Sequence, residues 1–343
     1  MKKFFQLISA IFLITLIFTG CGDDHSEKKK VAISFAHSSE IWERYGKTLQ
    51  DAMSVGNLYD VDFHFANSVD EQIQQIEKFV QDEPDCIIIG AVDRTRLASA
   101  LEKVKEKNIP VIAYDRLILD TDAVSYYVTF DNEAVGEAMG NSIEYFLFGS
   151  GVAQPTSTYN VEVFSGDPTD KNAEQYFNGA MKVLNRYFQS GVFVCRSGEM
   201  DFKTVSMADW NAQNVTTRMR RIMQTYYANG EPLNIVLCPN DAAADAVRNV
   251  LREVNYSGPF PILTGQDAEQ MALTAIQNGT QMFTIYKPPQ DLANKTVRMV
   301  KAVTDGIQPE INDNKTNNNG KITVPAYLCT PVIIDRDHIN IVQ

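Results

Sequence analysis

The sequence has few residues of the kinds that bind metals or form redox centres. Its 343 residues include five cysteines and four histidines, and no two cysteines have the CxxC spacing. The histidines are scattered along the chain without metal-ligand spacing, so we expect no metal and no cofactor. Four cysteines lie in or beside apolar runs, which favours buried thiols and leaves a disulfide among them open. These are Cys86, Cys195, Cys238 and Cys329.

Catalytic and nucleotide-binding motifs are also lacking. The sequence contains no GxSxG nucleophile elbow, no phosphate-binding P-loop and no dinucleotide-binding GxGxxG. Paired carboxylates are frequent in any acidic chain and therefore indicate no particular site. The sequence predicts that the protein is not an enzyme.

Positive charge is scarce. Lys and Arg number 31 against 43 Asp and Glu, which gives a formal net charge of -12. Such a surface repels phosphate backbones, so we expect no nucleic-acid partner. A basic cluster, Arg218, Arg220 and Arg221, falls on a predicted helix and is typical of a solvated face.

The one long apolar run is at the N-terminus. Lys2 and Lys3 precede an almost wholly apolar stretch from Phe4 to Phe18, and Thr19-Gly20-Cys21 follows. This layout is typical of a signal peptide over residues 1–20, and the Cys after Thr-Gly resembles the lipobox of bacterial lipoproteins. We expect Cys21 to carry the lipid and residues 21–30 to form a polar tether. An ordinary secretory signal or an uncleaved anchor is the alternative, but the run is shorter than the ~20 residues a spanning helix prefers.

Apolar strand-like runs alternate with amphipathic helix-like segments from residue 30 onward, and the alternation occurs twice. Strands that are apolar throughout and separated by helices indicate parallel sheets covered on both faces. In the first unit the expected strands are 31–35, 61–66, 86–89 and 110–114, with helices over 39–54, 71–81 and about 97–104. In the second, the expected strands are 160–164, 192–195, 234–238, 261–263 and 281–286, with helices over 173–187, 216–227, 242–254 and 268–278. The chain therefore predicts two doubly wound α/β units.

Polar side chains follow five of these expected strands. In open parallel sheets ligands bind beyond the carboxyl ends of the strands, so these positions are candidates for a site. Each residue taken alone is also typical of a turn or a helix cap, but five strand ends together favour a ligand. Carboxylates and amide oxygens accept from sugar hydroxyls, while Arg, Lys and amide nitrogens donate to them. The candidates are Asp115, Arg116, Asp170, Asn172, Asn240, Asp241, Asp267 and Lys287.

Tryptophan is rare, with only Trp42 and Trp210 in the chain. Each lies near the start of a predicted helix rather than inside an apolar run. A sugar ring needs a flat aromatic surface to lie on, so we predict that both stack on the ligand, with a core position as the alternative.

Several motifs, in order along the chain, resemble the periplasmic-binding-protein family for pentoses and hexoses, of the xylose-binding and multiple-sugar-binding type. The likeness runs from about residue 30 to 342. The motifs are Ile112-Ala113-Tyr114-Asp115-Arg116-Leu117-Ile118, Val128-Thr129-Phe130-Asp131-Asn132, Asn172-Ala173, Gly179-Ala180-Met181, Pro239-Asn240-Asp241, Gly265-Gln266-Asp267-Ala268 and Val324-Pro325-Ala326-Tyr327-Leu328.

This resemblance implies two Rossmann-like, doubly wound parallel-sheet lobes joined by a three-segment hinge, the type I architecture. It places the crossings near Asp131, after Lys287 and near Val324, with residues 31–131 and 288–323 in the N-terminal lobe and 132–287 and 324–343 in the C-terminal lobe. The family's sugar contacts match this chain at Asp115, Arg116, Asp170, Asn172, Trp210, Asn240, Asp267 and Lys287.

The chain departs from the family pattern before the first tryptophan. The family usually has an Arg there, and this chain has Ile41. Arg44 lies about 60° around a helix and roughly 4.5 Å along it from that position, so its long side chain is the expected substitute. The alternative is that Arg44 faces solvent or pairs with Glu40.

Together these features predict an extracytoplasmic lipoprotein that binds a monosaccharide of the xylose, glucose, galactose or arabinose class. We expect it to deliver the sugar to the permease of an ABC importer. The alternative is a sugar sensor that presents its ligand to a chemoreceptor or a sensor kinase. We expect a monomer that contacts the membrane only through its lipid anchor.

Overall fold

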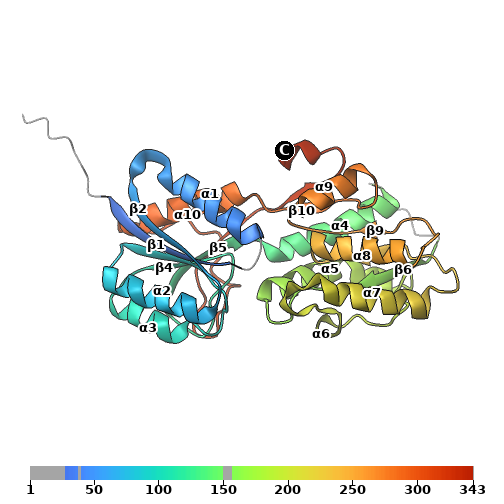
Figure 1. Ribbon diagram of the computed structural model, residues 1–343, viewed down its shortest axis with the longest axis horizontal. Helices are drawn as coiled ribbons and strands as arrows, with labels where there is room; N and C mark the ends of the chain where they lie inside the picture. Colours follow the sequence, from blue (N-terminus) through green and yellow to red (C-terminus); the bar gives the residue numbers. More distant parts are fainter. Residues whose placement is uncertain (1–27, 38–39, 150–156, 343) are drawn as a thin grey trace, which may run out of the picture.

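The computed structural model describes residues 28–37, 40–149 and 157–342, which form two lobes side by side (Figure 1). The expected signal peptide, Cys21 and most of the tether lie outside the described residues. Within the described ranges, no helix is long and apolar enough to cross a membrane.

The N-terminal lobe is built on a six-stranded sheet in which every neighbouring pair is parallel. The strand order is β2-β1-β3-β4-β5-β11. The elements of this lobe are β1 (Lys29–Ala36), α1 (Glu40–Ser54), η1 (Val55–Asn57), β2 (Tyr59–Ala66), α2 (Val69–Asp82), β3 (Cys86–Gly90), α3 (Ala98–Glu106), β4 (Val111–Tyr114), β5 (Val124–Phe130), α10 (Pro289–Thr304) and β11 (Ala326–Cys329).

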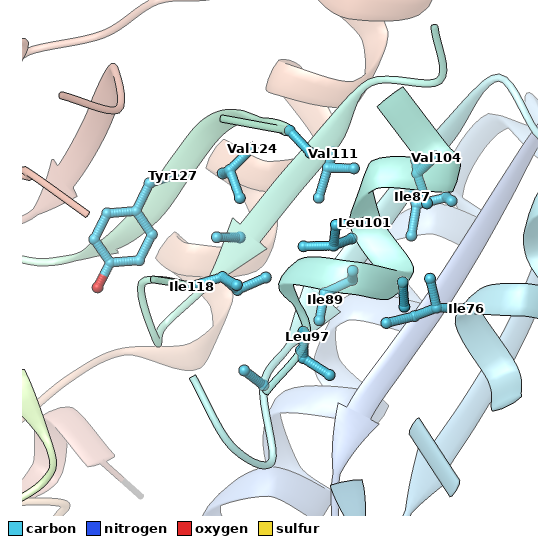
Figure 2. Close-up of a cluster of buried hydrophobic side chains, with 14 of the residues drawn as sticks. Ile76, Ile87, Ile89, Leu97, Leu101, Val104, Val111, Ile118, Val124 and Tyr127 are labelled. Atoms are coloured by element: carbon cyan, nitrogen blue, oxygen red, sulfur yellow. The ribbon is translucent and has the colours of Figure 1, made fainter. Parts of the chain in front are cut away.

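Both faces of this sheet are covered, which explains why its central strands are apolar throughout. Helices α1 and α10 cover one face, and α2 and α3 cover the other (Figure 1). Figure 2 shows the second of these cores, where Ile87 and Ile89 of β3 meet Leu101 and Val104 of α3. Burying one such side chain stabilises the fold by roughly 1.5–3 kcal/mol.

The C-terminal lobe has a smaller parallel sheet in the order β7-β6-β8-β9. Helices α4 and α5 pack on one face of it and α7 and α8 on the other. The elements of this lobe are α4 (Asn132–Phe148), β6 (Tyr159–Val163), α5 (Lys171–Gln189), β7 (Phe193–Val194), α6 (Phe202–Val205), η2 (Ala208–Trp210), α7 (Ala212–Tyr226), β8 (Ile235–Leu237), α8 (Asp241–Glu253), β9 (Ile262–Leu263), α9 (Gln270–Gln277), β10 (Thr284–Tyr286), β12 (Val332–Ile334) and η3 (Ile339–Val342).

The chain crosses between the lobes three times, and the third crossing is later than predicted. The first follows Phe130 at the end of β5, and the second joins β10 to α10. The prediction that residues 324–343 lie in the C-terminal lobe is wrong for its first part. Strand β11 pairs with β5, and Val324 and Ala326 are buried in the N-terminal core, so the crossing comes after Cys329.

The pairing after this crossing also differs from an all-parallel arrangement. Strand β12 runs antiparallel to β10 and forms a separate two-stranded sheet in the C-terminal lobe. The overall expectation of two α/β lobes of type I is nevertheless confirmed, since each lobe keeps its parallel sheet between two helical layers.

The four cysteines of the described residues are free thiols, so no disulfide joins them. Burial raises the pKa of the Cys329 thiol to about 12. Such thiols remain protonated and unreactive at neutral pH.

Candidate functional site

Asp115 follows β4 directly and is fixed by its backbone. Its φ of 61° lies in the left-handed region, which Asp tolerates better than most residues. Its carbonyl oxygen accepts hydrogen bonds from Tyr127 Oη at 2.6 Å, Thr129 Oγ1 at 3.1 Å and Asn172 Nδ2 at 3.2 Å. Asn172 belongs to the other lobe. The Asp115 backbone therefore joins the two lobes while its carboxyl group remains available at the strand end.

The Asp115 carboxyl lies within a cluster of charges from both lobes. Burial raises its pKa, Lys287 and Arg116 lower it, and Asp170 and Asp267 raise it again. Charged groups change the pKa of a carboxyl in this way only when they lie close to it. The structure therefore brings together polar residues that the sequence places at four separate strand ends.

Arg116 and Trp42 pack against each other at the N-terminal side of the cluster. Arg116 Nη1 donates to the carbonyl of Ala91 at 3.1 Å, and its guanidinium lies 5.2 Å from the centre of the Trp42 ring. Trp42 is 2% exposed and meets Phe35 edge to face. Trp42 is thus a core residue that supports Arg116, and a sugar contact by Trp42 itself stays a prediction.

Asp170, Asn172 and Trp210 form a connected group on the C-terminal side. Asp170 caps α5, because its Oδ1 accepts from the Asn172 amide at 3.0 Å, and its Oδ2 accepts from Trp210 Nε1 at 3.2 Å. The Asn172 side chain accepts from Asn132 Nδ2 at 3.0 Å. Asp170 therefore acts both as a helix cap and as the residue that orients a partly exposed indole.

Glycines allow both tryptophans to reach their positions. The six-membered ring of Trp42 lies so close to Gly90 that an added Cβ would clash with it, and the ring of Trp210 lies equally close to Gly166. Gly90 ends β3, and Gly166 comes three residues after β6. Each lobe therefore places a tryptophan on a glycine near the carboxyl end of one of its strands.

Lys287 and Asp267 form a buried ion pair beside the hinge. Lys287 Nζ lies 3.0 Å from Asp267 Oδ1, although not in the direction of a hydrogen bond, and donates to Tyr176 Oη at 3.3 Å. Burial lowers the pKa of Lys287. Asp267 raises it most, and Tyr176, Tyr45 and Asp115 raise it further, so this pKa is well above its ordinary value. The ammonium group is therefore charged at neutral pH.

Arg44 reaches across to the C-terminal lobe. Its Nη2 donates to the carbonyl oxygen of Asp267 at 3.2 Å, and its Nε is buried without a hydrogen-bond partner among the described residues. The expected substitute for the missing arginine thus lies where the two lobes meet. Whether its free Nε donates to a sugar stays a prediction.

Asn240 and Asp241 begin α8, and the structure separates their roles. Asn240 Oδ1 accepts from the Ala243 amide at 2.9 Å and so caps the helix. Asp241 is fully buried, and its carboxylate accepts from Gln281 Nε2 and Thr284 Oγ1, each at 2.9 Å. A third bond at 3.0 Å comes from the amide of the residue before α9.

The expectation that Asp241 binds sugar is therefore corrected. Both of its carboxylate oxygens hold α8, α9 and β10 together inside one lobe. Burial is the main reason why its pKa is raised well above the ordinary value.

Further polar side-chain atoms near this cluster belong to residues that are not among the site residues predicted from the sequence. They are buried, and they have no hydrogen-bond partner among the described residues: Tyr45 Oη, Tyr114 Oη, Asn132 Oδ1, Ser165 Oγ and Gln266 Oε1. Tyr114, Ser165 and Gln266 lie at or just after strand ends, so the rule that selected the other candidates could have found them. Tyr45 gives no such signal, because on α1 it is indistinguishable from a core residue.

The chemistry of this set suits an uncharged ligand rich in hydroxyl groups. A buried polar group without a partner costs roughly 1–3 kcal/mol, so such groups are rarely left unpaired. Here donors and acceptors are mixed, and three aspartates face two arginines and a lysine. Within the described residues, no group of three or more His, Cys, Asp or Glu is placed to hold a metal ion.

Comparison with known proteins assigns the chain to a family. The model of the periplasmic binding protein domain matches residues 31–308. The chain belongs to the periplasmic binding protein family. The family and the similar proteins reported below are sugar-binding proteins rather than enzymes, which confirms the expectation that this chain is not an enzyme.

Three similar members of the family span nearly the whole described fold. The multiple sugar-binding periplasmic protein SbpA of Azospirillum brasilense is 38% identical over 281 residues, which are 81% of this chain and 77% of the relative. The multiple sugar-binding periplasmic receptor ChvE of Rhizobium radiobacter is 37% identical over 282 residues, 81% of this chain and 78% of the relative. An ABC transporter solute binding protein from Clostridium phytofermentans, solved with bound β-D-glucose, is 37% identical with a TM-score of 0.84, covering 92% of this chain and 96% of that one.

Proposed function

We propose that this binding protein is an extracytoplasmic lipoprotein that captures one neutral monosaccharide, a pentose or hexose, between its lobes and delivers it to an ABC importer. One observation carries the proposal: both lobes contribute buried polar atoms without hydrogen-bond partners, among them Tyr45 Oη in one lobe and Asp267 Oδ1 in the other, and charged groups of both lobes act on the buried Asp115 carboxyl. Sugar hydroxyls both donate and accept, so one ring would satisfy groups of both kinds. The likeness to a solute binding protein that holds glucose supports the same class of ligand.

A signalling role is the second candidate. The relative ChvE is described as a receptor, which favours a chain that presents its loaded form to a chemoreceptor or a sensor kinase. The two roles use the same sugar site and differ only in the protein that recognises the loaded form.

The sugar-binding proposal is tested by titrating the purified protein with aldopentoses and aldohexoses in a calorimeter. We expect a stoichiometry near one and a higher melting temperature with the bound sugar, since a ligand well above its Kd stabilises the folded state. Absence of binding and of any melting shift at millimolar concentration, for every sugar tested, would contradict the proposal.

The lipid anchor is tested separately by Cys21→Ser. If Cys21 carries the lipid, the variant loses its anchor and should appear in the soluble extracytoplasmic fraction, whereas the parent stays with the membrane. Fractionation followed by immunoblotting measures the distribution. A variant that remains in the membrane fraction would indicate an uncleaved helix instead.

A further inference from the structure

Arg94 and Thr169 form a further contact between the lobes. Arg94 lies in the loop between β3 and α3 of the N-terminal lobe, and Thr169 lies between β6 and α5 of the C-terminal lobe. Arg94 Nη2 donates to the Thr169 carbonyl oxygen at 2.6 Å. This contact exists only when the lobes are close together.

Both partners are held by the same kind of turn. Asp93 Oδ1 accepts from the amide and hydroxyl of Thr95, at 2.8 and 2.7 Å. In the opposite lobe, Asp167 Oδ1 accepts from the Thr169 amide at 2.7 Å and from its hydroxyl. Because these Asp-x-Thr turns fix the backbone of each loop in advance, little conformational freedom remains to be lost when the lobes meet.

On the N-terminal side, the contact connects directly to the loop that carries the predicted sugar contacts. The Arg94 carbonyl accepts from the Leu119 amide at 2.8 Å, three residues after Arg116. Arg116 itself donates to the neighbouring Ala91 carbonyl at 3.1 Å. The Arg94 loop and the loop of Asp115 therefore form one unit.

A similar connection exists on the C-terminal side. Asp167 Oδ2 accepts from the amide of Asp209, which precedes Trp210. Thr169 itself precedes Asp170, the residue that orients the Trp210 indole. The Arg94–Thr169 bond therefore favours the arrangement in which the predicted contact residues of both lobes surround one ligand.

We propose that Arg94 is a closure residue. It stabilises the closed arrangement of the lobes through the Thr169 carbonyl and so sets ligand affinity without touching the ligand. This role rests on the proposed sugar-binding function. The apparent Kd of a protein equals the intrinsic Kd divided by the fraction in the competent arrangement, so loss of the bond multiplies the Kd of every sugar by one common factor.

A direct contact would act differently. A residue that touches the ligand discriminates between sugars that differ at the contacted hydroxyl, because an unpaired buried group is costly. Arg94 Nη1 is buried without a hydrogen-bond partner among the described residues, so the two roles have to be separated by experiment.

The matched control is two residues away. Arg96 donates to Asp70 at 2.8 Å within the N-terminal lobe, and both side chains are more than half exposed. Arg96→Ala thus removes the same side chain without affecting contact between the lobes, and Arg94→Lys keeps a charged donor of different geometry.

The experiment measures association and dissociation rates of Arg94→Ala, Arg94→Lys and Arg96→Ala with several pentoses and hexoses that bind the parent. Sugar-free melting and circular dichroism check that each variant is folded. We expect Arg94→Ala to raise Kd about tenfold, the usual scale for one charge-assisted hydrogen bond, by the same factor for each sugar and through faster dissociation. The Kd of Arg94→Lys should lie between those of the parent and Arg94→Ala, and the Kd of Arg96→Ala should equal that of the parent.

Different failures have different meanings. A parent that binds no monosaccharide contradicts the proposed function. A parent that binds sugar, together with an Arg94→Ala variant of equal affinity, contradicts only the closure role. A factor that differs from sugar to sugar also overturns the closure role, because it indicates direct contact.

Discussion

Replacing Asp267 by alanine is expected to remove sugar binding and to destabilise the fold. Its carboxylate is a predicted acceptor for the ligand and lies 3.0 Å from the Lys287 ammonium. Charge-assisted hydrogen bonds contribute about 1.5–3 kcal/mol each, so losing two of them should raise Kd at least about a hundredfold. Side-chain exposures of 8% for Lys287 and 14% for Asp267 leave little solvent screening, and breaking such a buried pair costs about 3–5 kcal/mol.

The destabilisation should depend on pH in a definite direction. In the parent, the pKa of Lys287 is raised above its ordinary value, so the stability this gives is complete at neutral pH and is lost only as the pH rises through the raised value. Without Asp267, the largest effect that raises the pKa of Lys287 is gone, so burial lowers this pKa. The variant then regains stability as its buried lysine loses a proton. The difference in the free energy of unfolding between parent and variant should therefore become smaller as the pH rises towards 10.

Two further variants separate the causes. Asp267 has a φ of 94°, where alanine is strained and asparagine is better tolerated, so Asp267→Asn removes the charge with less backbone strain. Asp305→Ala removes an exposed carboxylate that pairs with Lys301 and should leave both affinity and stability within about 0.5 kcal/mol of the parent. Calorimetric Kd and denaturant unfolding are the measurements. Sugar binding by Asp267→Ala within a few fold of the parent would show that this carboxylate is not a ligand acceptor.

The rule that ligands bind beyond strand ends predicted much of the charged cluster, because parallel strands end at a common edge. Asp115, Asp170 and Asp267 come from different strand ends, and the charges of Asp170 and Asp267 raise the pKa of Asp115. The same rule fails for Asp241, because it cannot tell a side chain that faces the cleft from one that turns back into its own lobe. That difference depends on partners such as Gln281 and Thr284, which lie about 40 residues away in sequence.

The lobes were predictable from apolar periodicity, but the path of the last crossing was not. Two short apolar stretches, Ala326–Cys329 and Val332–Ile334, are separated only by Thr330-Pro331. Both stretches suit a strand, and nothing local assigns them to different sheets. Helix α4 is also absent from the expected elements, since glycines at 136 and 140 weaken its helical pattern. The need for glycine at these two positions follows from the close approach of α5, which the sequence does not show.

Gly136→Ala is expected to destabilise the C-terminal lobe, against the usual effect of this change in a helix. Alanine is favoured over glycine in helix interiors by roughly 0.5–1 kcal/mol. Here, however, an added Cβ would clash with the backbone oxygen of Tyr176 and lie 2.8 Å from the backbone nitrogen of Ala180, both on α5. Backbone atoms cannot rotate away, so the two helices must separate, and overpacking of this kind costs typically 1–3 kcal/mol or more. The clash should therefore outweigh the gain in helix propensity.

The same substitution should weaken sugar binding, because α5 carries Asn172 and Tyr176. Movement of α5 away from α4 would displace the Asn132–Asn172 bond and the Tyr176 hydroxyl that accepts from Lys287. Asn141→Ala is the control, since Asn141 is exposed on the same helix and should tolerate alanine or gain slight stability from it. Denaturant unfolding should show lower stability, and calorimetric titration weaker sugar binding, for Gly136→Ala. Neither loss is expected for Asn141→Ala. A Gly136→Ala protein more stable than the parent would mean that the helices are free to adjust, and that their close approach does not position the site.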